Sequence, residues 1–122
     1  MTILQNEVLR ALALALLCAV PLASGCANPV EAACNDRCPA EQREGCRDPS
    51  EDCASTCYTA GQLSNDLYAR ASKAGCSFAY TSWESCLIDA PHCSDINAYC
   101  AVPLNSLNSC VETFCLANPG AC

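Results

Sequence analysis

"CNDRCPAEQREGCRDPSEDCASTC", residues 34–57, decides the fold predicted for this chain, because it begins and ends with the same Cys-x3-Cys unit. On an α-helix, positions i and i+4 lie on one face, so each unit presents two sulfur atoms on adjacent turns to a neighbouring helix. Two such helices packed antiparallel join the outer cysteines, Cys34 with Cys57, and the inner ones, Cys38 with Cys53. The spacing therefore predicts a helical hairpin closed by two disulfides.

The second half of the chain repeats itself at an offset of 24 residues. "CSFAYTSWESCL", residues 76–87, aligns with "CAVPLNSLNSCV", residues 100–111, and both are Cys-x9-Cys units. Ten helical steps return to about 80° from the starting direction, so both sulfurs of a unit can face one neighbour. The same antiparallel logic predicts the pairs Cys76–Cys110 and Cys86–Cys100. Four further structural cysteines have no evident mates: Cys46, Cys93, Cys115 and Cys122.

Local signals favour helices over strands. Asp48 is placed as an N-cap, with Pro49 at the first helical position and Glu51 completing a capping box. The 3-4 spacing of apolar residues that follows predicts a helix over about Pro49–Lys73, which Gly75 stops.

Two prolines are expected to limit the other helices. Pro39 should shorten the first helix, and Pro103 should kink or divide the fourth, whose N-cap we assign to Ser94. Alternation of period two occurs only in "SFAYTSW", residues 77–83, the one stretch that also fits a strand. We therefore predict an all-α, disulfide-stapled domain over residues 34–122, with about four helices in two hairpins, about 34–75 and 76–122.

The chain of 122 residues contains 14 cysteines, a share typical of small disulfide scaffolds. Its start, "MTILQNEVLR", is followed by the apolar run "ALALALLCAV", by Pro21 and by small residues. This layout predicts a secretory signal peptide over residues 1–25, and its apolar run is too short for a membrane-spanning helix.

Cys26 directly follows that leader and is either a lipid attachment point or the first residue after an ordinary signal-peptidase cleavage. Cys18 is discarded with the leader, which leaves 13 cysteines from Cys26 onward, and setting Cys26 aside leaves 12, enough for six disulfides. Ala23 and Gly25 also satisfy the small-x-small rule for ordinary signal cleavage before Cys26. We favour lipidation at Cys26, with residues 26–33 as a short tether.

"LASGC", residues 22–26, resembles the lipobox of bacterial lipoproteins, in which the cysteine is acylated and becomes the new N-terminus. It departs from the most typical pattern in carrying Ala23 where leucine is usual. The resemblance implies a membrane lipid anchor of the palmitate type at Cys26. Under bacterial sorting rules Ala27, rather than Asp, implies the outer membrane.

The cysteine framework resembles the twin Cys-x3-Cys and twin Cys-x9-Cys hairpins of the mitochondrial intermembrane space, which we take as convergent geometry. It is more similar to short cysteine-rich predicted lipoproteins of myxobacterial-type genomes, which combine a lipobox, Cys-x3-Cys helices and a Trp-x-x-Cys element like Trp83–Cys86. This resemblance implies location and fold but almost no activity.

The mature part keeps a net charge of −7, since the leader carries one acidic and one basic residue, Glu7 and Arg10. No basic patch exists to displace phosphate counterions, so nucleic acid is not expected as a partner. An acidic surface is also an ordinary solubility device for an exported domain.

No catalytic or metal constellation stands out. Cys-x2-Cys and histidine-mixed metal patterns are absent, as are thioredoxin-like Cys-x-x-Cys, phosphate-binding loops and nucleophile elbows. His92, the single histidine, is expected in a solvated turn. Four carboxylates are expected at helix starts, where the helix dipole accounts for them: Glu41, Glu44, Glu51 and Asp52.

Seven aromatic side chains are expected to fill space around the sulfurs: Tyr58, Tyr68, Phe78, Tyr80, Trp83, Tyr99 and Phe114. The sequence thus predicts a non-enzymatic, envelope-anchored lipoprotein that acts as a structural or interaction module, without a cofactor or metal and with an envelope protein as its partner. A soluble secreted effector or inhibitor is the first alternative, and a thiolate metal carrier is the second.

Overall fold

A computed structural model describes residues 28–122 of the chain. The elements in order are α2 (Pro29–Glu44), α3 (Cys53–Lys73), α4 (Ser77–Asp89), α5 (Ile96–Tyr99), α6 (Ala101–Ala117) and the short 3-10 helix η1 (Pro119–Ala121). Residues 28–122 contain no strand, so the prediction of an all-α, disulfide-stapled fold is confirmed. The predicted signal peptide, Cys26 and Ala27 lie outside the described residues.

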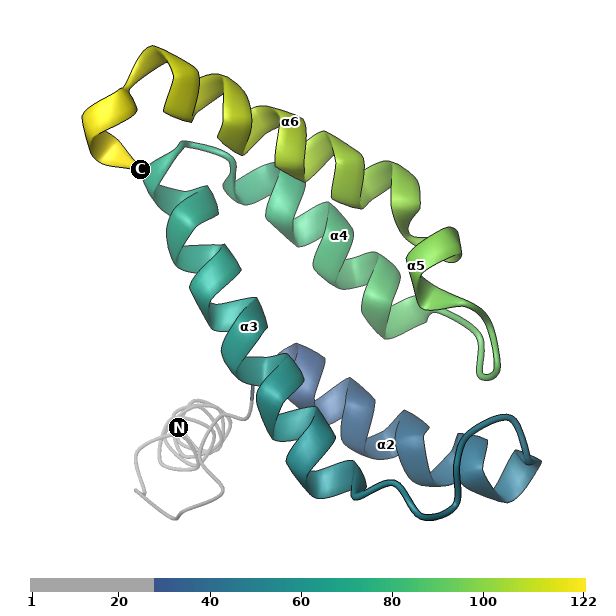
Figure 1. Cartoon of the computed structure of the whole chain (residues 1–122). Helices are drawn as coiled ribbons and strands as arrows, with labels where there is room; N and C mark the ends of the chain where they lie inside the picture. The colour runs from purple at the N-terminus through teal and green to yellow at the C-terminus, as the bar shows by residue number, and fades with distance from the viewer. Residues whose placement is uncertain (1–27) are drawn as a thin grey trace, which may run out of the picture.

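The long helix α3 connects two helical hairpins (Figure 1). Its N-terminal part lies alongside α2, and α4 follows after a tight turn and lies alongside α6. Further contacts join α4 to both α2 and α3, so the second hairpin packs onto the first. This arrangement brings the loop after α2 and the loop after α4 to the same end of the molecule.

The helix α2 begins earlier and ends later than the sequence predicted. Asn28 caps it, because its side-chain oxygen accepts hydrogen bonds from the N–H groups of Val30 and Glu31. Val30 is buried, so the expected tether over residues 26–33 is helical from Pro29. The prediction that Pro39 shortens this helix was wrong: the proline removes only one helical hydrogen bond, and the carbonyl it releases belongs to exposed Asn35.

The predicted start of α3 at Pro49 was also wrong, by four residues. The Asp48 carboxylate accepts from the N–H and hydroxyl of Ser50, so it closes a turn and does not cap a helix. The side-chain amide of Gln42 donates to the backbone carbonyls of Asp48 and Glu51, which holds this turn against α2. Asp52 provides the N-cap instead, and the helix ends at Lys73 before Gly75, whose φ is +72°.

The second hairpin differs from its prediction in two details. Residues 77–83, the stretch that also fitted a strand, form the start of α4. The predicted fourth helix is divided at Cys100 into α5 and α6, three residues before Pro103. Pro103 is tolerated inside the first turn of α6, where the N–H groups have no helical partner. Asp95 rather than Ser94 caps α5. Because of the division at Cys100, residues 28–122 contain five α-helices where about four were expected.

Six disulfides join all twelve cysteines of residues 28–122. The four pairings predicted from the spacing are present, namely Cys34–Cys57, Cys38–Cys53, Cys76–Cys110 and Cys86–Cys100. The cysteines without predicted mates form Cys46–Cys93 and Cys115–Cys122. Cys46–Cys93 is the one disulfide that connects the two hairpins, because each of the others closes within a single hairpin or the C-terminal turn.

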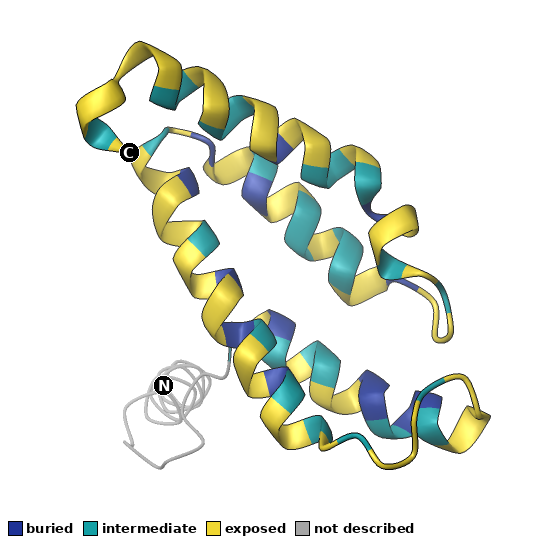
Figure 2. Cartoon of the chain, viewed as in Figure 1, coloured by how far each residue is buried: buried dark blue, intermediate teal, exposed yellow. Residues whose placement is uncertain are grey.

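The hydrophobic core is small and lies where α3, α4 and α6 meet (Figure 2). Its buried members are Ala71, Cys76, Tyr80 and Leu107. The expectation that the aromatic side chains fill the interior was largely wrong, since only Tyr80 is buried. Four are exposed instead: Tyr58, Tyr68, Phe78 and Tyr99. Disulfides therefore take over much of the stabilisation that a domain of this size lacks in buried apolar area.

Candidate functional site

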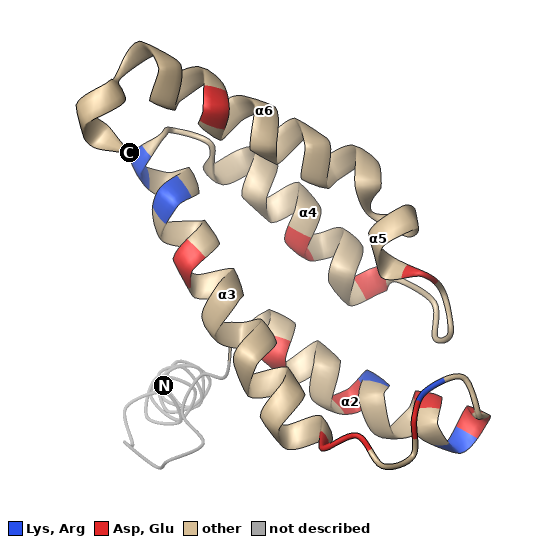
Figure 3. Ribbon diagram, in the orientation of Figure 1, with Lys and Arg blue, Asp and Glu red and all other residues tan. Residues whose placement is uncertain are grey.

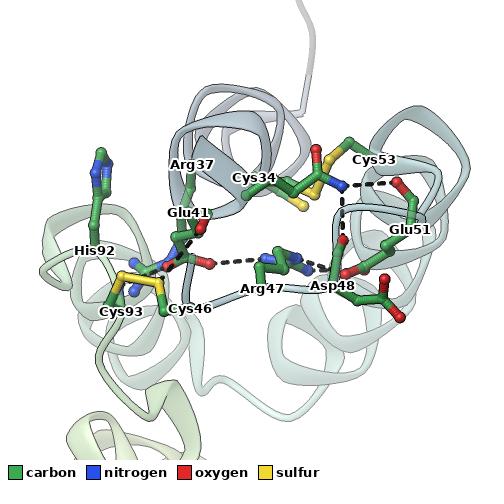
Figure 4. A network of polar contacts seen from close by, with 12 residues as sticks. Cys34, Arg37, Glu41, Cys46, Arg47, Asp48, Glu51, Cys53, His92 and Cys93 are labelled. Carbon is green, nitrogen blue, oxygen red and sulfur yellow. Dashed lines mark hydrogen bonds and ion pairs between the residues drawn. A yellow bond between two sulfur atoms is a disulfide. The ribbon is translucent and has the colours of Figure 1, made fainter. Parts of the chain in front are cut away.

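The two loops joined by the Cys46–Cys93 disulfide contain a network of polar contacts (Figure 4). One loop follows α2 and begins at Gly45, whose left-handed φ of +81° ends the helix. The other follows α4 and contains Pro91, His92 and Cys93. We refer to this region, residues 37–51 with 90–94, as the hairpin junction.

Arg37 lies buried at the centre of the hairpin junction, with 7% of its surface exposed. Its guanidinium donates to the Glu41 carboxylate at 2.5 Å, to the carbonyl oxygen of Ala90 at 2.8 Å and to that of Pro91. It also reaches the hydroxyl of Ser94 at 3.2 Å. The planar fork of arginine suits such a set of acceptors, and it clamps the loop after α4 to α2.

Glu41 is equally buried and accepts hydrogen bonds from three directions. The donors are Arg37, the Nη1 atom of Arg47 at 3.0 Å and the backbone N–H of Cys93 at 3.0 Å. Burial acts to raise the pKa of Glu41, but the hydrogen bonds from Cys93, Arg37 and Arg47 together outweigh it and hold this pKa below its ordinary value. Glu41 is therefore a charged anchor for both loops.

Arg47 extends this network to the turn before α3. It donates to both carboxylate oxygens of Glu51, at 2.7 and 3.0 Å, and this pairing is the main cause that raises the pKa of Arg47. The same contact lowers the pKa of Glu51. Every buried side-chain nitrogen or oxygen in residues 28–122 has a hydrogen-bond partner, so the junction is a closed set of charges.

Beside this closed network lies an exposed group of four side chains, which we call the loop cluster: Glu44, Cys46, His92 and Cys93. The Nδ1 atom of His92 is 3.1 Å from Oε1 of Glu44, and the Sγ atom of Cys93 is 3.2 Å from the other oxygen, Oε2. The ligand atoms of Glu44, Cys46 and Cys93 all lie within 4.8 Å of one another. This is the group of His, Cys, Asp and Glu side chains in residues 28–122 that could hold a metal ion.

The predicted carboxylates are thus distributed differently from their expected places. Asp52 does cap a helix, whereas Glu41 and Glu44 lie in the last turn of α2 and Glu51 lies in a turn. His92 is in an exposed turn, as predicted, but it contacts Glu44. The sequence could not reveal this meeting, because Glu44 and His92 are 48 residues apart and come together only when the second hairpin packs onto the first.

Charge is distributed unevenly over the molecule (Figure 3). All five basic residues of the described part lie on α2, α3 or the loop between them: Arg37, Arg43, Arg47, Arg70 and Lys73. The hairpin of α4 and α6 has no basic residue and exposes large apolar side chains, with Phe78 86% exposed and Val102 and Leu116 each 77% exposed. A groove of about 380 Å³ runs between α2 and α4 and is lined by Ala33, Leu87 and Ile88.

No protein-family model matches the chain, and no curated protein or solved structure is significantly similar to it. Six disulfides in a domain of this size indicate an oxidising, extracytoplasmic environment. Within residues 28–122, no helix has the length and apolar character needed to cross a bilayer.

Proposed function

We propose that the protein is a lipid-anchored module of the bacterial envelope, held at the outer membrane through Cys26 and acting by binding another envelope protein. The observation that carries this proposal is the cysteine count together with the pairing. All twelve cysteines from Cys34 to Cys122 form disulfides with one another. The predicted mature chain has one more cysteine, Cys26, which precedes these twelve. A cysteine set apart from a complete disulfide framework, directly after a leader, is what lipidation requires.

Binding is favoured over catalysis because the buried polar groups of the described residues satisfy one another. A general base or nucleophile must be free to meet a substrate, whereas Arg37, Glu41 and Arg47 are engaged on several sides by loop atoms. By contrast, the α4–α6 hairpin exposes Phe78 and Val102 to solvent on a surface without basic residues. Exposed apolar side chains of this kind are typical of protein interaction surfaces.

The anchor is tested by fractionating cells that express the wild-type protein, Cys26→Ser or Cys18→Ser. We expect the wild-type protein and Cys18→Ser in the membrane fraction, with incorporation of a clickable palmitate analogue, because Cys18 lies in the discarded leader. Cys26→Ser should lose the label and leave the membrane.

Membrane retention of Cys26→Ser, or an unlabelled wild-type protein in the culture medium, contradicts the anchor. The second result favours the alternative of a soluble secreted effector or inhibitor, cleaved before Cys26 by ordinary signal peptidase.

A further inference from the structure

The loop cluster combines the side-chain types that bind zinc, and the fold brings them together from two separate loops. It offers the Sγ atoms of Cys46 and Cys93, an oxygen of Glu44 and a nitrogen of His92. The Cys46–Cys93 disulfide occupies both sulfurs in the oxidised protein. Reduction of this single bond converts the cluster into two thiols, one imidazole and one carboxylate.

We propose that the reduced loop cluster binds one Zn²⁺ ion through Cys46, Cys93, Glu44 and His92. Tetrahedral zinc has bonds of about 2.3 Å to sulfur and about 2.0–2.2 Å to nitrogen or oxygen, which separates neighbouring ligand atoms by about 3.3–3.8 Å. The present separations of Glu44 from His92 and from Cys93, 3.1 and 3.2 Å, are only slightly shorter. The ligand atoms of Glu44, Cys46 and Cys93 already lie within 4.8 Å of one another, whereas the imidazole of His92 must turn toward the sulfurs, and the two sulfurs must move apart after reduction, to admit the ion.

The reductant is a dithiol donor, such as an extracytoplasmic thioredoxin-like protein or dithiothreitol. Its thiolate attacks one sulfur of Cys46–Cys93, forming a mixed disulfide and releasing the other sulfur as a thiolate. The second thiol of the donor then displaces the first cysteine, so two electrons and two protons pass to the protein and the donor leaves as a disulfide. Zinc binding releases the two thiol protons to solvent.

Cys46–Cys93 is the disulfide best placed for such exchange. It is the only one of the six in which both cysteines are exposed. Four of the other five each contain one buried cysteine: Cys38, Cys57, Cys76 or Cys100. Because exchange requires access of the attacking thiolate to sulfur, a limiting amount of donor reduces Cys46–Cys93 first.

The ligands stay together after reduction because contacts other than the disulfide hold the loops. Arg37 donates to the carbonyl oxygens of Ala90 and Pro91, and the N–H of Cys93 donates to Glu41. The remaining disulfides keep each hairpin closed by itself. The buried ion pair thus positions the loop cluster, and the disulfide controls whether it can bind metal.

The test begins with the mature, fully oxidised protein, treated anaerobically with limiting dithiothreitol, which is then removed. Alkylation and mass mapping should identify Cys46 and Cys93 as the labelled cysteines. Titration with Co²⁺ should give one ion per chain and a thiolate-to-metal charge-transfer band in the near ultraviolet, and one equivalent of Zn²⁺ should abolish this band. The oxidised protein should give no such band.

Variants separate this site from other thiols. We expect Glu44→Gln to weaken Co²⁺ and Zn²⁺ binding by at least the roughly tenfold that loss of even an outer-shell partner costs. The matched control Glu112→Gln, at an exposed glutamate of α6, should bind normally, as should Cys115→Ser/Cys122→Ser. Cys46→Ser/Cys93→Ser should give no band after the same treatment.

Three results would overturn the proposal: a different disulfide opens first, the reduced protein binds metal no better than the oxidised form, or Cys46→Ser/Cys93→Ser still shows the band. Unchanged affinity in Glu44→Gln also overturns the proposed ligand set. Glu44→Gln leaves every disulfide intact, so its result does not depend on the folding of a cysteine variant.

Discussion

Replacing Glu41 with glutamine tests whether the buried charges hold the two hairpins together. The substitution keeps the shape of the side chain but removes the negative charge between Arg37 and Arg47. The Arg37 and Glu41 side chains are only 8% and 9% exposed, so the variant leaves a buried guanidinium without its counter-charge. Breaking a buried ion pair in this way costs about 3–5 kcal/mol.

The expected loss lies at the lower end of this range, about 3 kcal/mol, because Arg37 retains three other acceptors in the loop after α4. Glu51→Gln is the matched control. It removes the other carboxylate partner of Arg47, but that pair is 22% and 27% exposed and screened by solvent, so the expected loss is much smaller than that of Glu41→Gln. Guanidinium unfolding without reductant, followed by far-ultraviolet circular dichroism, measures both losses.

The dependence on pH provides a second check of the same reasoning. The pKa of Glu41 is lowered on folding, so the carboxylate stabilises the folded state fully above its ordinary value of 4.5 and loses this contribution as the pH falls through the folded value. The stability difference between the wild-type protein and Glu41→Gln should therefore shrink below pH 4.5. A loss under 1 kcal/mol at pH 7, or a difference that stays constant to pH 3, would refute the role assigned to this charge.

Three further substitutions test packing, each by thermal or guanidinium unfolding. Gly61→Ala should destabilise the fold by about 1–3 kcal/mol, because the added Cβ would lie 2.9 Å from Cβ of Glu31 on α2, and this clash outweighs the higher helix propensity of alanine. Gly120→Ala is the control and should be neutral, because its added Cβ would meet no atom within 4 Å. Leu107→Ala, at a fully buried position, should cost about 2–5 kcal/mol. Burial is the main cause that raises the pKa of Tyr80 above its ordinary value of 10, so its stabilisation should be complete below pH 10 and be lost as the pH rises through its folded pKa, which an absorbance titration measures.

Cysteine spacing was sufficient to predict both hairpins and four disulfides. In each hairpin the two partner units are adjacent in the chain and fold back on each other, so local helical periodicity determines which sulfurs meet. Cysteine spacing could not predict the Cys46–Cys93 disulfide, because this pairing depends on how the second hairpin packs onto the first. The same packing brings Arg37 to the carbonyl of Ala90, 53 residues away, so the candidate site could not be derived from spacing either.

The predicted start of α3 was wrong for a different physical reason. Asp48, Pro49 and Glu51 satisfy every local rule for a helix start, yet Gln42 of α2 captures the carbonyls of Asp48 and Glu51 and stabilises a turn. The prediction that the aromatic side chains fill the interior was largely wrong because the core is small. The buried core of Ala71, Cys76, Tyr80 and Leu107 contains one aromatic ring, Trp83 packs against it partly buried, and residues such as Phe78 remain outside it.

The nesting of the disulfides also determines how the domain responds to mechanical tension. A pulling force applied before α2 and after α6 would pass from Cys34 through sulfur to Cys57, run along the backbone to Cys76 and pass through sulfur again to Cys110. The two disulfides would carry that force past the loops between the members of each pair, and Cys46–Cys93 joins those loops as a second covalent route. Between Cys34 and Cys110, only the backbone from Cys57 to Cys76 could therefore lengthen along this path, which limits the extension of the domain and suits the membrane-anchored module that we propose.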